Sequence, residues 1–234
     1  VKEMESARAH LSYRPLRTPK AAAFAGIGFA LLQIISYVLM YSAIPAEEMF
    51  EQGLLEDYAR ATWLALGLLP FAGIAFLWFT GVMRDLLGDL EDKFFATVFL
   101  GSGIILVVMM FVWAGAYGAI FGTYQALADV LTNFDIFVYA TTFTNQIIGN
   151  YLLRMAGVYM LSTASLWTRT SAVPRWLSIV TYIVALAFLF FAGGLRWARF
   201  IFPAWVLLVS IYILILNYRH TQENKDNEPL TLDE

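Results

Sequence analysis

Residues 95–119 read FATVFLGSGIILVVMMFVWAGAYGA and contain no charged side chain. Each residue of an α-helix rises 1.5 Å, so about 20 apolar residues cross the ~30 Å hydrocarbon core of a bilayer. This stretch exceeds that length. The composition of the whole chain is also that of a membrane protein: 60% of the residues are hydrophobic, 14% are charged, and the mean hydropathy is +0.66. Because ordinary globular domains are far less apolar, the sequence predicts an all-α integral membrane protein.

Five further stretches are apolar, the last two of them short but sufficient to cross, which predicts a polytopic transmembrane bundle of six spans. The fourth is longer than a bilayer requires, so we expect it to tilt or to project beyond the hydrocarbon. The first is too long for a signal peptide, and we expect it to stay in the protein as a span. The six stretches are 21–43, 61–83, 95–119, 137–167, 176–193 and 201–216.

The charged residues between and around these stretches predict the topology. If the N-terminus is inside, eleven Lys and Arg residues lie in cytoplasmic segments, whereas Arg60, Arg196 and Arg199 lie in outer loops. Cytoplasmic loops carry the excess of Lys and Arg in membrane proteins, so both termini are predicted to be cytoplasmic. Arg196 and Arg199 predict a turn at residues 195–200, because a five-span alternative would bury both.

Three regions follow along the chain. Residues 1–20 form a basic cytoplasmic tail, residues 21–217 the six-helix transmembrane domain, and residues 218–234 an acidic cytoplasmic tail. The last of these has the composition of a segment without a packed structure. No separate soluble domain is predicted.

The fourth stretch contains a charged residue deep in a predicted span, Arg154. A cation in the hydrocarbon costs about 2.5 to 3.5 kcal/mol unless it faces protein or water, so such residues often mark functional sites. Thr142, Gln146, Asn150 and Arg154 recur every fourth residue, which places them on one face of a helix. Lipid cannot satisfy polar groups, so we expect this polar stripe to face the bundle interior or a cavity.

The partners of Arg154 are expected to be neutral, because none of the six stretches contains Asp or Glu. The candidates are backbone carbonyls and polar side chains of the first and third spans: Gln33, Ser36, Tyr37, Tyr41, Ser102 and Tyr117. Two interpretations stay open. In one, the guanidinium clamps neighbouring helices together or reaches outward toward Asp135; in the other, it binds an anion or polar solute. The candidate solute-binding residues are Arg154, Asn150, Gln146, Thr142, Gln33 and Tyr37.

Several chemistries have no residues to support them. The chain has no cysteine, and its two histidines, His10 and His220, lie in the tails. A haem, a copper centre or another intramembrane metal site is therefore not expected, and no cofactor is predicted. No lysine lies deep in a span, and no buried acid and base are available, so the protein is not expected to be an enzyme. A net charge of -3 gives no reason to expect a nucleic-acid partner.

Two segments resemble a known group of proteins. Residues 70–103, PFAGIAFLWFTGVMRDLLGDLEDKFFATVFLGSG, and residues 154–182, RMAGVYMLSTASLWTRTSAVPRWLSIVTY, are similar to small bacterial six-span membrane proteins known as domain-of-unknown-function proteins. The resemblance implies a multi-pass protein of the bacterial cytoplasmic (inner) membrane. It brings no activity, ligand or catalytic residue with it.

Two functions are compatible with these observations. The first is a channel or transporter-like protein, a homo-oligomer, that passes a small anionic or polar solute along the polar stripe. The alternative is a non-catalytic accessory subunit or lipid-binding scaffold of a larger membrane complex, with membrane lipids as partners and the stripe as an assembly surface.

Overall fold

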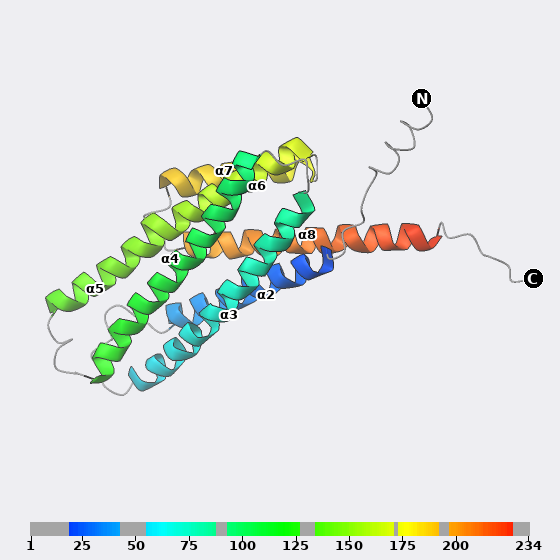
Figure 1. Ribbon diagram of the computed structural model, residues 1–234. Coiled ribbons are helices and arrows are strands. Elements are labelled where there is room, and N and C mark those ends of the chain that lie inside the picture. Colours follow the sequence, from blue (N-terminus) through cyan, green and yellow to red (C-terminus); the bar gives the residue numbers. More distant parts are fainter. Residues whose placement is uncertain are drawn as a thin grey trace, which may run out of the picture.

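The computed structural model describes residues 19–42, 55–87, 93–126, 134–170, 173–191 and 197–226. All regular secondary structure in these ranges is helical, which confirms the all-α class (Figure 1). In chain order the elements are α2 (Pro19–Ser42), α3 (Leu55–Leu87), α4 (Lys93–Ala126), α5 (Phe134–Gln146), the π-helix η2 (Ile147–Leu152), α6 (Leu153–Thr170), α7 (Arg175–Phe191) and α8 (Ala198–Asp226).

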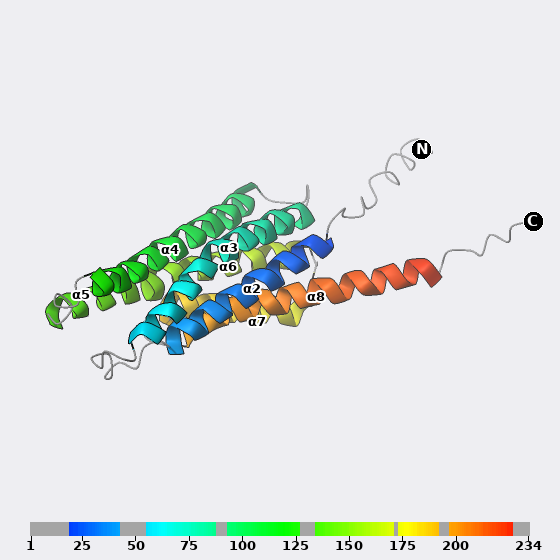
Figure 2. The same ribbon diagram turned by 90° about the horizontal axis from the view of Figure 1, so that it is seen from below.

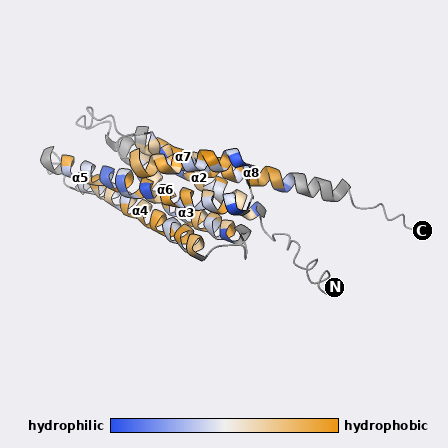
Figure 3. Ribbon diagram, turned by 90° about the horizontal axis from the view of Figure 1, so that it is seen from above, coloured by the Kyte–Doolittle hydropathy of each residue, from blue (hydrophilic) through white to orange (hydrophobic). Residues whose placement is uncertain are grey.

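The helices form an elongated bundle. α2 packs against α3 and α8, while α6 packs against α4 and α7. Figure 2 shows the C-terminal part of α8 running out beyond the other helices, well past the end predicted for the transmembrane domain at residue 217. Apolar residues cover most of the bundle, and hydrophilic residues gather along α5 and α6 (Figure 3).

Four of the helices are long and apolar enough to cross a bilayer. They match the first, second, third and sixth stretches predicted from the sequence, whereas α7 is apolar but shorter. The four candidate spans are Lys20–Met40, Arg60–Arg84, Phe94–Thr123 and Ala198–Tyr218. Six spans and cytoplasmic termini stay predictions.

Small residues on α2 allow the helices to approach closely. Ala22 and Ala30 are fully buried on α2, and a Cβ placed on Gly26 between them would overlap the Ser210 hydroxyl of α8 and the Phe79 ring of α3. A small-residue ridge of this kind is a common device for packing membrane helices. It fixes α2 between α3 and α8.

α7 ends at Phe191 and α8 begins at Ala198, which confirms the predicted break between the fifth and sixth stretches. The last helix starts at residue 198 instead of the predicted 201, so Arg199 lies in its first turn, half-buried, and not in the turn before it. Arginine can lay its apolar stem along the protein while the guanidinium reaches a polar neighbour, so a helix end tolerates it. Arg196 lies outside the described residues.

Candidate functional site

The predicted polar stripe lies on one continuous helix. α5, η2 and α6 follow one another without a break over residues 134–170, because Gln146 and Leu153 on either side of η2 both keep right-handed helical dihedrals. Ile147, Ile148 and Leu152 of η2 are buried. The π-turn therefore turns an apolar face to the bundle and its polar residues outward.

The outward direction of the stripe corrects the expectation that it faces the bundle interior. Thr142, Gln146 and Arg154 are exposed on the surface of the bundle, and Asn150 is partly exposed. The physical reason is that the opposite face of the same helix carries the larger apolar side chains, which fill the space against α4 and exclude the polar residues from it.

Three stripe residues are joined by hydrogen bonds. Arg154 Nη1 donates to the Asn150 side-chain oxygen at 2.9 Å and to the Asn150 carbonyl at 3.1 Å. The Asn150 amide nitrogen in turn donates to the Gln146 side-chain oxygen. A π-turn holds more residues than an α-turn. The wider turn offsets the angle by which residues four apart move around an α-helix, and this helps to keep the three side chains in line.

The same guanidinium also contacts a second helix. Arg154 Nε donates to the Leu189 carbonyl at 3.3 Å, in the last turn of α7. Carbonyls in the last turn lack an intrahelical donor and carry the negative end of the helix dipole, so a cation there is favourable. The contact has the geometry of the predicted interhelical clamp, with a backbone carbonyl as the acceptor.

Close packing of α6 on α7 brings these groups together. Gly157 lies one turn after Arg154, and a Cβ placed on it would come within 2.9 Å of the Ala185 carbonyl and 3.2 Å of Leu189 Cγ. A larger residue at this position would hold α7 away. Gly157 is therefore a positioning residue for the Arg154 contact.

The Arg154 end of the stripe lies level with the apolar part of α4. Leu152 lines a cavity together with Leu106 and Met110, which are near the middle of the apolar part of α4, Phe94–Thr123. Arg154 is two residues further along the same helix. Its guanidinium therefore lies well inside the apolar zone defined by α4, although it is exposed on the single chain.

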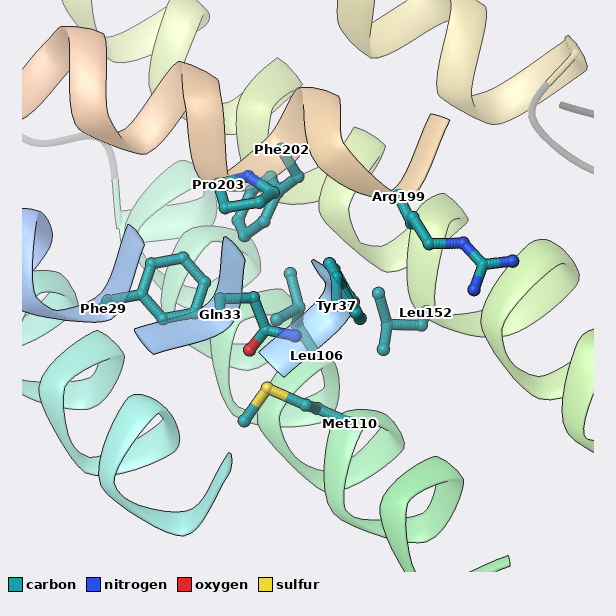
Figure 4. Close-up of a pocket in the computed structure, with 9 residues that line it drawn as sticks. All are labelled: Phe29, Gln33, Tyr37, Leu106, Met110, Leu152, Arg199, Phe202 and Pro203. Atoms are coloured by element: carbon teal, nitrogen blue, oxygen red, sulfur yellow. The ribbon is translucent and has the colours of Figure 1, made fainter. Parts of the chain in front are cut away.

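Gln33 and Tyr37 do not join the stripe. Both are buried on α2 and line a small cavity with Arg199, Phe202 and Pro203 of α8 (Figure 4). The six predicted solute-binding residues thus fall into two groups, one on the outer surface and one inside the bundle.

Arg199 and Gly157 are parts of these sites that sequence reasoning missed. The charge of Arg199 predicts a loop at this position. If the last helix starts before residue 201, however, Arg199 and Pro203 are four residues apart and lie on one face of it. The spacing of Gly157 from Arg154 gives no sign of the α7 backbone that packs against it. In the part of the chain that the structure describes, no group of three or more His, Cys, Asp or Glu side chains could hold a metal ion.

Comparison with protein-family models, with curated proteins and with solved structures finds no match. The resemblance to small bacterial six-span proteins therefore stays a prediction.

Proposed function

We propose that this protein is a non-catalytic membrane subunit that assembles through the polar stripe, residues Thr142, Gln146, Asn150 and Arg154. The observation that carries the proposal is the outward position of the stripe, with Arg154 level with the apolar part of α4. The place of assembly that the sequence resemblance implies is the bacterial cytoplasmic membrane.

The energetics of the bilayer favour a protein neighbour at this surface. Hydrocarbon offers no hydrogen-bond partner to the hydroxyl of Thr142 or the amide of Gln146, and a lipid-facing guanidinium costs a few kcal/mol. The internal hydrogen bonds from Arg154 to Asn150 and Leu189 lower this cost but leave Thr142 outside the network. A polar face on another helix would satisfy the remaining groups, each contact contributing about 0.6 to 2 kcal/mol.

Cysteine cross-linking tests the proposal directly, because the chain contains no cysteine of its own. Thr142→Cys and Gln146→Cys are each labelled with a thiol-reactive benzophenone, which inserts into C–H bonds of any neighbouring protein on irradiation, photolysed in native membranes and separated on gels. Ile35→Cys is the matched control, since Ile35 is 46% exposed on α2, a helix that packs against α3 and α8.

The expected result is a cross-linked band for both stripe variants and none for the control. A band at twice the chain mass identifies a second copy as the neighbour, and a band at another mass identifies a different subunit. If neither stripe variant forms an adduct of any mass, or if the control reacts as readily, the proposal is wrong.

One observation favours a second candidate, a path for an anionic or polar solute between assembled copies. Arg154 uses Nε and Nη1 for its hydrogen bonds, and within the described residues Nη2 has no acceptor. A guanidinium with donors to spare is receptive to an anion. Purified protein in liposomes would then conduct anions, and Arg154→Ala would reduce the flux; absent or unchanged flux speaks against this candidate.

A further inference from the structure

The cavity between α2, α4, η2 and α8 contains a polar side chain that the protein itself does not satisfy. Gln33 is 2% exposed, and neither its amide oxygen nor its amide nitrogen makes a hydrogen bond within the described part of the chain. A buried amide left in this state costs about 1 to 3 kcal/mol. Native structures rarely tolerate that cost without a partner, and an ordered water is a common one.

The surroundings of Gln33 leave space for such a partner. Figure 4 shows the amide lying between Leu106, Met110 and Tyr37, with Phe29 beside it and Phe202 and Pro203 above. The centre of a water molecule can occupy about 10 Å³ there. That volume is close to the ~10 to 15 Å³ needed for one water and too small for a larger solute.

A second polar group borders the same space. Tyr37 lies one helical turn after Gln33 on the same face of α2, and it is also buried. Its hydroxyl is near enough to interact with the amide, but the two do not form a direct hydrogen bond of good geometry. A molecule between them could accept from the Gln33 nitrogen, donate to its oxygen and bond the tyrosine hydroxyl.

The opposite wall of the cavity belongs to α8. Pro203 has no N–H and so interrupts the hydrogen-bond ladder of α8 on the face that meets Gln33. The small residues around Gly26 bring α2 and α8 together further along, so the space is confined to this level of the bundle.

We propose that this cavity is a binding site for a single water molecule, held by the Gln33 amide and the Tyr37 hydroxyl at the junction of α2 with α8. The water satisfies the buried amide of α2 at the level where α2 faces Pro203 of α8. This site lies inside one chain and does not depend on assembly through the polar stripe.

Radiolytic labelling in H₂¹⁸O tests the site on the intact protein. X-rays turn a bound water into a hydroxyl radical that oxidises the side chains next to it, even where bulk solvent cannot reach. Met110 lines the cavity and is 1% exposed, whereas Met160 is equally buried, at 0%, but does not line it. The expected result is several-fold faster ¹⁸O incorporation at Met110 than at Met160. Equal labelling of the two methionines overturns the proposal.

Thermal unfolding in detergent provides a second measurement. In Gln33→Leu the water loses its main partners, so we expect the Met110 labelling to disappear and the unfolding midpoint to fall by several degrees. If the cavity is dry, the same substitution removes an unsatisfied amide and the midpoint rises instead, which contradicts the proposal.

Discussion

Gly157→Ala tests whether the close packing of α6 on α7 holds the Arg154 contact in place. A Cβ at this position would lie 2.9 Å from the Ala185 carbonyl, 3.1 Å from Phe188 Cβ and 3.2 Å from Leu189 Cγ. Two of these atoms belong to the backbone or lie next to it. They can move away only if α7 itself shifts.

The size of the effect follows from three contributions. Overpacking of a tight contact costs about 1 to 3 kcal/mol. A shift of α7 also lengthens the hydrogen bond from Arg154 to the Leu189 carbonyl, now 3.3 Å, which adds part of the ~0.6 to 2 kcal/mol of an interhelical bond. Alanine in place of glycine returns about 1 kcal/mol through its higher helix propensity. The net expectation is a loss of about 0.3 to 3 kcal/mol.

Gly81→Ala is the matched control. Gly81 lies on α3, and a Cβ placed there meets no atom within 4 Å, so the propensity gain alone applies and the variant should be up to ~1 kcal/mol more stable. Both free energies of unfolding are measured by tryptophan fluorescence during titration of dodecylmaltoside micelles with sodium dodecyl sulfate. If Gly157→Ala is stabilised as much as Gly81→Ala, the packing of α6 on α7 is not as tight as described.

Three further variants follow from the structure. Arg154→Lys should lower the thermal midpoint, because one ammonium on a flexible stem cannot reproduce the fork that reaches two helices; an unchanged midpoint contradicts the clamp. The Tyr159 and Thr80 hydroxyls form a buried hydrogen bond of 3.1 Å, which Tyr159→Phe and Thr80→Val each remove. Each variant should therefore lose about 0.5 to 1.5 kcal/mol of unfolding free energy, and the double variant should lose less than the sum of the two. Gly26→Ala should destabilise the bundle, because the new Cβ overlaps the Ser210 hydroxyl. Adding Ser210→Ala should restore part of the lost stability, since that hydroxyl has no hydrogen-bond partner among the described residues. If the double variant shows no recovery, this contact is not the cause.

The apolar helices could be predicted because their signal is local. Uninterrupted hydrophobic length is readable in any window of sequence, and α2, α3, α4 and α8 correspond to predicted spans. The small-residue ridge around Gly26 was readable for the same reason, since spacing alone puts its members on one face.

The direction of the polar stripe could not be predicted, because it depends on which helices cover which face. Four-residue spacing shows that Gln146, Asn150 and Arg154 share a face, but it says nothing of the neighbour on that side. The π-turn carries no clear local signal either. The acceptor at Leu189 arises only when α7 packs beside α6, and that is a tertiary event.

The position of Arg199 was missed for a different reason. A hydropathy window treats every arginine as a boundary, yet a helix end can bury the stem of an arginine while its charge stays near a polar group. The sequence likewise gives no sign that Gln33 and Tyr37 lie apart from the stripe. Only the packing of the helices places these two residues in an internal cavity and the other four on the outer surface.

The π-turn at Ile147–Leu152 has a consequence for the length of this segment. A π-turn is wider than an α-turn, and six π-helical residues turn the chain through about the same angle as five α-helical ones, so deleting one residue there, such as Gly149, would let the turn relax into an ordinary α-helical one with little rotation of α5 relative to α6. Arg154 would keep its place on α7, and Thr142 and Gln146 would keep facing outward. A deletion in a purely α-helical part of the same helix would instead rotate the preceding segment by about 100° and change its partner-facing surface, so this segment tolerates the loss of a residue that its neighbours do not.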